Sequence, residues 1–223
     1  MAIEPEQLAA APQPTWRRLG VFGGSFDPIH LGHLIVASEA RYHLGLDYVL
    51  FVPANVSPFK SGATTFSATD RLAMIELAVA ADARLGASRI ELDRPGPSYT
   101  VDMLRGLRAQ HPGAQLHFIM GADSLLTFHL WRQPTEILSL ARLAVLKRPG
   151  ATVDLDQLDR ELPGLAAATD IVDTLEIGIS STLVRNRLAQ GSPVRYLVPR
   201  RVEDYIRSLD LAKEKGANAR PSC

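Results

Sequence analysis

The chain has 223 residues, enough for one α/β domain with a sizeable core. Its 24 basic and 24 acidic residues give a net charge of zero, which argues against a nucleic-acid-binding module and means that any affinity for phosphate must be local. No apolar run approaches the roughly 20 residues of a membrane helix, and the sole cysteine, Cys223, excludes an internal disulfide, a cysteine metal site and a catalytic thiol.

Residues 1–17 are predicted to form a flexible extension. They are rich in Ala, Pro, Gln and Glu and lack the basic start and apolar stretch of a secretory signal, which together with the lone cysteine predicts a cytoplasmic protein. Residues 18–211 are predicted to fold as a single domain. The polar, basic segment 212–223 is predicted to be a mobile tail.

The most informative segment lies at the start of the domain. A strand-like run, Leu19–Phe22, leads through two glycines into a helical pattern, Leu31–His43. Glycines before a helix N-terminus let phosphate oxygens approach unpaired N–H groups, and His30 and His33 would share one face of the first helical turn. The segment therefore predicts a phosphate site, although it fits neither a P-loop nor a G-x-G-x-x-G fingerprint.

Strand-like runs alternate with helical patterns along the rest of the domain. Strands are predicted at Leu19–Phe22, Tyr48–Pro53, Arg89–Leu92, Leu116–Met120, Leu143–Leu146 and, as a short one, near Asp170–Thr174. Helices are predicted at Leu31–His43, Ala68–Ala81, Thr100–His111, Pro134–Ala141, Leu155–Leu165, Ser181–Gln190 and Pro199–Leu209. This order predicts an α/β fold with a Rossmann-like, doubly wound, mainly parallel sheet and helices on both faces, which binds ligands beyond the carboxyl ends of its strands.

Three further segments carry candidate site residues. The loop Pro53–Lys60 ends in a lysine that could reach a phosphate, although a loop lysine is often simply solvated. Trp131 offers a flat surface for an aromatic ligand, although packing is the usual role of tryptophan. The segment Ile179–Arg185 places hydroxyl groups where a late helix begins and a forked cation one turn inside it, which predicts a second anion site or, more simply, a capped helix with a solvated arginine.

The opening segment, G-G-S-F-D-P-I-H-x-G-H, resembles the signature of the H-x-G-H nucleotidylyltransferase superfamily, and its long form is similar to that of the bacterial nicotinate-mononucleotide adenylyltransferases. The resemblance covers roughly residues 18–208 and includes segments at Pro53–Lys60, Pro97–Asp102, Gly121–Asp123 and Ile179–Arg185. Ser57 and Phe59 depart from the family's proline and histidine, so that a phosphate role is carried over only to Lys60.

The resemblance implies ATP and nicotinate mononucleotide as substrates, and nicotinate adenine dinucleotide and pyrophosphate as products, in NAD biosynthesis. His30 and His33 are the implied catalytic residues, at the α-phosphoryl group. The implied ATP-binding residues are Gly23, Gly24, Ser25, Phe26, His30, His33, Gly121, Asp123, Ser180, Ser181, Thr182 and Arg185. The implied acceptor-binding residues are Lys60, Thr100 beside the nicotinate carboxylate and Trp131 stacked on the pyridine ring.

The residue types suit adenylyl transfer. A phosphate monoester has a second pKa of about 6, so the attacking oxygen is already ionised at neutral pH and needs no general base. Direct in-line attack without a covalent intermediate then depends on positioning and on charge stabilisation. Mg²⁺ is expected to be carried by the ATP phosphates, with no dedicated protein ligand assigned.

The sequence leaves two alternatives open. The same site could serve another acceptor, as in a phosphopantetheine adenylyltransferase or a cytidylyltransferase. The altered Pro53–Lys60 loop would instead suit a nucleotide sensor that binds ATP without catalysing a reaction. The presence of His30, His33 and Arg185 argues against a sensor, because a protein that only binds nucleotide would not need this complete set of charge-stabilising residues. The preference for the nicotinate over the nicotinamide compound is implied by the resemblance alone.

Overall fold

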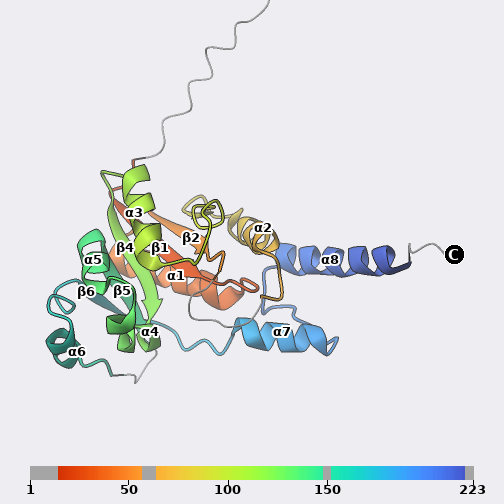
Figure 1. Cartoon of the computed structure of the whole chain (residues 1–223). Coiled ribbons are helices and arrows are strands. Elements are labelled where there is room, and N and C mark those ends of the chain that lie inside the picture. The colour runs from red at the N-terminus through yellow and green to blue at the C-terminus, as the bar shows by residue number, and fades with distance from the viewer. Residues whose placement is uncertain (1–14, 57–63, 148–151, 219–223) are drawn as a thin grey trace, which may run out of the picture.

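A single six-stranded sheet organises the molecule. The computed structural model describes residues 15–56, 64–147 and 152–218, and in it the strands lie in the order β3-β2-β1-β4-β5-β6, each pair parallel (Figure 1). The strands are β1 (Arg18–Gly24), β2 (Tyr48–Pro53), β3 (Leu85–Ala87), β4 (Gln115–Gly121), β5 (Ala141–Lys147) and β6 (Thr169–Asp173). The winding direction reverses between β1 and β4, which is where doubly wound sheets bind ligands. The predicted fold is confirmed.

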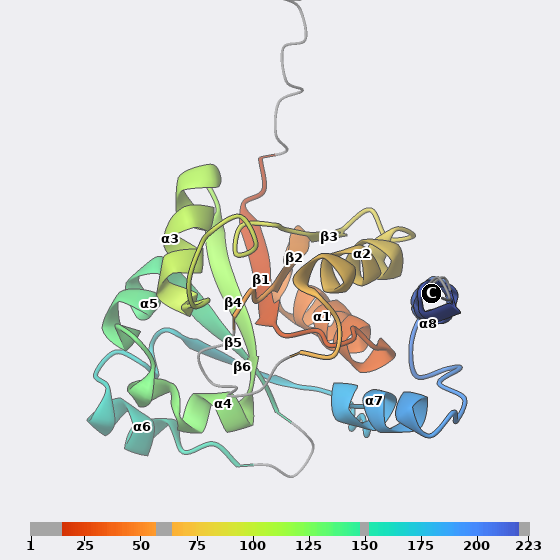
Figure 2. The same ribbon diagram turned by 45° about the vertical axis from the view of Figure 1, so that its right-hand side comes forward.

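Helices cover both faces of the sheet. They are α1 (Leu31–Leu44), α2 (Ala68–Val79), α3 (Thr100–Gln110), α4 (Ala122–Leu126), the 3₁₀ helix η2 (Phe128–Leu130), α5 (Pro134–Leu140), α6 (Leu155–Glu161), α7 (Ser181–Ala189) and α8 (Arg200–Asn218). Helices α3 to α6 lie on one side of the sheet, and α1, α2, α7 and α8 lie on the other (Figure 2). None of the helices in the described part of the chain is long and apolar enough to span a bilayer.

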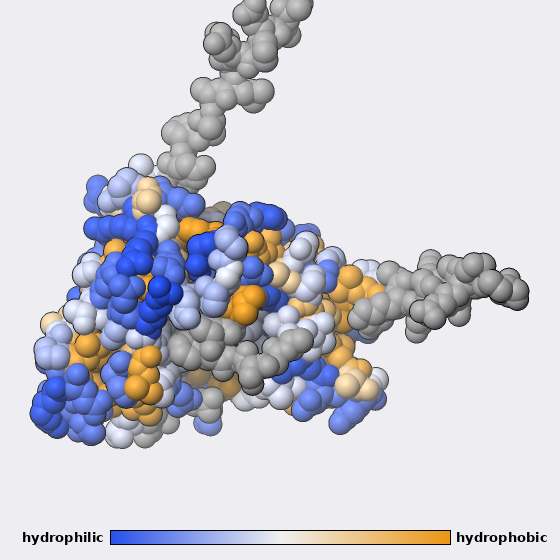
Figure 3. All heavy atoms as spheres, in the orientation of Figure 1, coloured by the Kyte–Doolittle hydropathy of each residue, from blue (hydrophilic) through white to orange (hydrophobic). Residues whose placement is uncertain are grey.

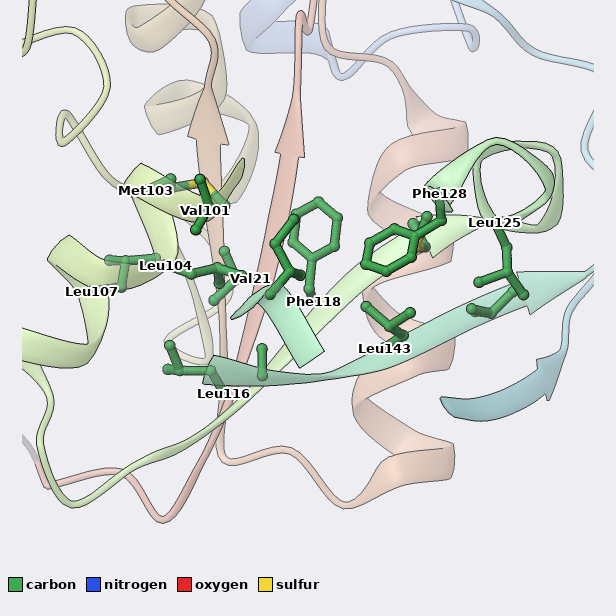
Figure 4. Packing of buried hydrophobic residues seen from close by; sticks show 14 of the residues in the cluster. Val21, Val101, Met103, Leu104, Leu107, Leu116, Phe118, Leu125, Phe128 and Leu143 are labelled. Carbon is green, nitrogen blue, oxygen red and sulfur yellow. The ribbon is translucent and has the colours of Figure 1, made fainter. Parts of the chain in front are cut away.

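Each face of the sheet has its own hydrophobic core. Strand residues alternate between the faces, so that Leu116 and Phe118 of β4 pack toward α3, while Ile119 packs toward α1 and α2. Figure 4 shows the first core, in which α3 contributes Val101, Met103, Leu104 and Leu107. On the outer surface seen in Figure 3, the side chains over α3 and α5 are mostly hydrophilic, as expected for helices that bury one face.

Gly20 of β1 marks a close approach within the second core. A Cβ atom at this position would lie 2.9 Å from Leu46 Cδ1 and 3.0 Å from Val49 Cγ2. Gly20→Ala is therefore expected to lower the free energy of unfolding by about 1–3 kcal/mol through overpacking. Chemical denaturation measures the change, and Gly113→Ala is the control because no atom lies within 4 Å of the added methyl group. Equal stabilities of the two variants would contradict the prediction.

The predicted strand at Arg89–Leu92 is wrong. These residues form a turn in which the Leu92 and Asp93 amides donate to the Arg89 carbonyl, and the strand β3 lies earlier in the chain. Its residues, Leu85–Ala87, have little intrinsic strand preference, and they are held by pairing with Val49–Phe51 of β2.

Four helices also differ from the sequence-based expectation. Helices α4 and η2 are additional short elements between β4 and α5. Helix α6 ends at Glu161 because Pro163 disfavours helical backbone at Leu162. Helix α8 continues to Asn218, past the boundary expected at residue 211, through a segment rich in the helix formers Ala, Lys and Glu.

The N-terminal boundary of the domain lies earlier than expected. Trp16 falls within the predicted extension 1–17, yet its ring stacks on Tyr48 with centroids 4.4 Å apart and lies 5.1 Å from the ring of His111. The amides of Arg17 and Arg18 both donate to the Asp47 carboxylate. The packed part of the chain therefore includes Trp16 and Arg17, while residues 1–14 lie outside the described part.

Candidate active site

Two cavities flank the carboxyl end of β1. The histidine cavity, of about 310 Å³, is lined by Phe22, His30, His33, Gly121 and Asp123 together with segments after β6. The tryptophan cavity, also of about 310 Å³, is lined by Gly23, Gly24, Ser25, Thr100 and Trp131 together with residues of β2, β4 and α3. Because the neighbouring residues Phe22 and Gly23 face opposite sides of the sheet, β1 separates the two cavities and ends between them.

The two histidines lie at the beginning of α1. His30 is the N-cap residue, and its ring stacks on that of His33 with centroids 3.6 Å apart. The His30 amide donates to His33 Nδ1 over 3.2 Å, which fixes the orientation of the second ring. A Cβ atom at Gly32 would lie 3.0 Å from His30 Nδ1, so glycine is needed for this close arrangement. The predicted pairing of the imidazoles on one helix face is thus present in the structure.

Burial favours the neutral form of the His30 imidazole near pH 7. Its side chain is 5% exposed, and burial lowers its pKa to about 4. Its Nδ1 atom has no hydrogen-bond partner among the described residues. A neutral imidazole carries one N–H donor, which suits a polar ligand, and a bound anion would favour its protonated form.

Acid should destabilise the protein through its buried histidines. Burial also lowers the pKa of His117 to about 4, whereas both histidines would titrate near pH 6.5 in the unfolded chain. The unfolded state therefore binds protons that the folded state does not, and stability falls as the pH drops from about 6.5 toward 4. We expect a loss of about 2 kcal/mol per histidine between pH 7 and pH 5, measured by urea denaturation at each pH. His30→Gln and His117→Gln should each flatten this dependence, and an unchanged slope in both would contradict the assignment.

The glycine turn lies on the tryptophan side of β1. Gly23, Gly24 and Ser25, which the resemblance assigns to ATP, line the tryptophan cavity. Phe26 is 2% exposed and adopts φ 45°, with its ring packed edge-on against His33. Its side chain is therefore part of the core, and the backbone is the part of Phe26 that a ligand could contact. A Cβ atom at Gly24 would lie 3.0 Å from the Phe26 ring, which explains the glycine.

Aromatic side chains build one wall of the tryptophan cavity. Trp131 follows η2 and lies 6.0 Å from the ring of Phe118 and 5.3 Å from that of Phe128. Thr100 is the first residue of α3, as predicted, and Tyr99 is its N-cap. The guanidinium carbon of Arg132 lies 4.5 Å above the Tyr99 ring, so a cation stands beside this aromatic cluster.

Glu91 is a cavity residue that sequence reasoning missed. It lines the tryptophan cavity, is 3% exposed and forms an ion pair with Arg94 at 3.0 Å. Arg94 also donates to the Pro97 carbonyl and lies 3.7 Å from the Asp102 carboxylate, so it connects the turn to the first turn of α3. The sequence pattern predicts a strand at Arg89–Leu92, and it gives no indication that Glu91 lies in a turn and pairs with Arg94.

The late helix α7 docks on the opening motif. Ser180 is its N-cap and accepts from the Leu183 amide. Ser181 Oγ donates to the Pro28 carbonyl over 2.9 Å, and Arg185 Nη1 donates to the Asp27 carbonyl over 2.7 Å. Arg185 Nη2 also donates to Thr182 Oγ1. Residues more than 150 positions apart in sequence are therefore brought together by these hydrogen bonds.

The end of β4 completes the histidine cavity. Gly121 is the last residue of β4, and Asp123 lies in the first turn of α4. Thr174, Ile177 and Ile179, from the segment after β6, line the same cavity and were not identified from the sequence. This wall combines apolar side chains with a carboxylate.

Lys60, Ser57 and Phe59 lie outside the described residues. The last described residues before them are fixed to the tryptophan cavity, since the Asn55 amide donates to Ser98 Oγ and Val56 forms a bridge with Pro97. Within the described ranges, no three His, Cys, Asp or Glu side chains are grouped so that they could hold a metal ion.

Comparison with known proteins identifies close relatives. Residues 21–187 match the family model described as cytidylyltransferase-like. The chain is 46% identical over 194 residues to a protein of Roseiflexus castenholzii named probable nicotinate-nucleotide adenylyltransferase, covering 87% of this chain and 97% of the relative. It is 41% identical over 206 residues to a protein of the same name from Mycolicibacterium vanbaalenii, covering 92% and 96%.

Solved structures share the fold. Nicotinic acid mononucleotide adenylyltransferase of Plasmodium falciparum, solved in complex with APC, superposes with a TM-score of 0.69 at 16% identity and covers 88% of this chain and 98% of its own. The same enzyme in complex with NaAD also superposes with a TM-score of 0.69, at 17% identity. At this level of identity the likeness supports the fold.

Proposed function

Because the chain belongs to the cytidylyltransferase-like family and, within it, to the nicotinate-nucleotide adenylyltransferases, we propose that it transfers the adenylyl group of ATP to nicotinate mononucleotide. The observation that carries this proposal is the pair of cavities on either side of β1, one lined by stacked histidines and the other by Trp131. Two substrates bound in them would meet at the end of β1, where the sheet reverses its winding.

The reaction is a direct displacement. A phosphate oxygen of nicotinate mononucleotide attacks the α-phosphorus of ATP in line, a new P–O bond forms, and the bond to the β-phosphate bridging oxygen breaks. Pyrophosphate leaves with that electron pair, and nicotinate adenine dinucleotide is the product. Because the nucleophile is already an anion, the protein has to align two negatively charged groups and to stabilise the charge that develops between them.

We assign the residues that line the two cavities according to their cavity, and the start of α7, Arg185 and Lys60 according to the family resemblance. His30 and His33 would donate to the α-phosphoryl oxygens, and the start of α7 with Arg185 would face the β- and γ-phosphates. Trp131 would stack on the pyridine ring, and the N-terminus of α3 at Thr100 would face the nicotinate carboxylate. Gly121 and Asp123 would lie at the nucleoside of ATP, and Lys60 would contact the acceptor phosphate.

Mg²⁺ would accompany ATP. Mg²⁺ commonly keeps several waters and binds through substrate phosphates, so the triphosphate of ATP would supply most of its ligands. When bound, the ion reduces the charge of the triphosphate. The protein residues then bind and orient the two substrates. The cytoplasmic location expected from the sequence stays a prediction.

The test is pyrophosphate release from ATP and Mg²⁺ with nicotinate mononucleotide, nicotinamide mononucleotide and phosphopantetheine in parallel assays. We expect release with the nicotinate compound and little with the other two. Release with phosphopantetheine instead would overturn the acceptor but keep the chemistry. Absence of release from a folded protein that binds ATP by calorimetry would indicate a sensor.

A further inference from the structure

Glu91 is a buried acid in the wall of the tryptophan cavity, and the proposed function gives it no role. It lies in the turn after β3 and is 3% exposed. Among the described residues that line this cavity, it is the only one with a charged side chain. A buried carboxylate is costly to the fold even when it is paired with a cation. Its position in a substrate cavity therefore calls for a functional explanation.

The Glu91 carboxylate keeps part of its capacity to accept hydrogen bonds. Arg94 Nη2 donates to both of its oxygens, over 3.2 Å to Oε1 and 3.0 Å to Oε2. This nitrogen is the only donor to the Glu91 side chain among the described residues. An ionised carboxylate has about four lone-pair sites and can only accept. Acceptor positions are therefore left for a donor that a ligand in the cavity would supply.

Arg94 holds this carboxylate in a fixed orientation. The same Nη2 atom donates to the Pro97 carbonyl over 2.9 Å, and Nη1 lies 3.7 Å from Asp102 Oδ2 in the first turn of α3. The guanidinium is thus tied to the segment before α3 and to the helix itself. An acceptor that is oriented before the ligand arrives binds it at a smaller entropic cost.

The chemistry of the acceptor decides which of its parts can face a carboxylate. Nicotinate mononucleotide carries an acid at each end, and the proposed function directs the nicotinate carboxylate to Thr100 and the phosphate to Lys60. Glu91 would repel both ends, because like charges raise each other's energy at short range. The ribose between them carries two hydroxyl groups, which are hydrogen-bond donors. The ribose is therefore the part of the acceptor that suits Glu91.

We propose that Glu91 is a specificity-determining residue whose carboxylate accepts a hydrogen bond from a ribose hydroxyl of the acceptor. The inference rests on the proposed function, which supplies the acceptor and its orientation in the cavity. A site with a buried polar group for a substrate hydroxyl rejects an analogue that lacks the hydroxyl, because the buried group is then left without its partner. Glu91 thus selects a phosphate monoester that carries a ribose.

The experiment compares nicotinate mononucleotide with its 2′-deoxy and 3′-deoxy analogues as acceptors. Hydroxyl discrimination is defined as the KM for an analogue divided by the KM for the parent compound, from initial rates of pyrophosphate release. For at least one analogue we expect a wild-type discrimination of about 10-fold to 100-fold, the range for a lost hydrogen bond to a charged group. Calorimetric titration with each acceptor gives the same ratio independently of turnover.

Two matched variants assign this discrimination to Glu91. Glu91→Gln keeps the shape of the side chain and replaces a charged acceptor with a neutral one, so discrimination should fall about threefold to tenfold. Asp93→Asn makes the same chemical change in the same turn, at a side chain that is 60% exposed, pairs with Arg89 and does not line the cavity. It should leave discrimination unchanged. A purely structural role for Glu91 would raise the KM for all three acceptors equally and leave the ratio as it is.

Several results would overturn the inference: wild-type KM values for both analogues within about twofold of the parent value, unchanged discrimination in Glu91→Gln, or an equal fall in Asp93→Asn. If Glu91→Gln does not fold, Glu91→Asp decides, because it keeps the charge and withdraws the carboxylate by one methylene group. Discrimination should then fall at least about threefold, and an unchanged ratio would overturn the inference. Wild-type protein that releases no pyrophosphate with any acceptor would refute the proposed function alone, and the calorimetric ratios would still test Glu91.

Discussion

Replacing His30 with alanine is expected to lower kcat by about 10²-fold to 10³-fold, the loss measured when one preorganised donor to a developing negative charge is removed. His30 is 5% exposed, lines the histidine cavity and stacks on His33, so its imidazole is held in place before the substrate arrives. Steady-state pyrophosphate release with saturating ATP and nicotinate mononucleotide measures the change.

The matched control for this experiment is His43→Ala. His43 lies on the same helix, is exposed at the surface and contacts only Glu39 among the ion pairs in the described part of the chain. Its removal should leave kcat unchanged. If His30→Ala folds, as judged by its melting curve, and retains the wild-type kcat, the histidine pair has no part in stabilising the transition state.

Trp131→Ala is expected to raise the KM for nicotinate mononucleotide by about 10-fold to 100-fold, since stacking of a base on an aromatic side chain contributes about 1–3 kcal/mol. The KM for ATP should change little, because Trp131 lines the cavity on the opposite side of β1 from His30. Trp131→Phe keeps part of the stacking surface and should lie between the wild type and the alanine variant. Initial rates at varied acceptor concentration give the comparison.

Trp16→Ala serves as the control for the tryptophan experiment. Its ring packs on Tyr48 and His111, away from both cavities of the candidate site, so its loss should lower stability without changing either KM. An acceptor KM that stays at the wild-type value in folded Trp131→Ala would contradict the stacking role. A parallel rise in both KM values would indicate a structural role for Trp131 through Phe118 and Phe128.

The sequence by itself determined the elements that carry strong local patterns. The apolar run Tyr48–Pro53 is a strand with the predicted bounds. The helix predicted from Leu31 begins at that residue, directly after its N-cap His30, and it is terminated by Gly45, which adopts the left-handed conformation. These features depend on neighbouring residues, whose periodicity and turn chemistry are visible in the chain. For the same reason the opening motif could be located, since its glycines and histidines form one continuous segment.

Tertiary structure alone decided the features that depend on distant partners. Leu85–Ala87 became a strand through pairing with β2, and Glu91 became a buried cavity residue through its turn and Arg94. Arg71 donates to the carbonyl of Ser25, 46 residues earlier in the chain, and Arg185 donates to the carbonyl of Asp27, 158 residues earlier. No local pattern encodes such contacts, because the burial and charge pairing of a residue depend on which surfaces the folded sheet brings together. The free energy gained from these tertiary contacts then overrides weak local preferences for helix or strand.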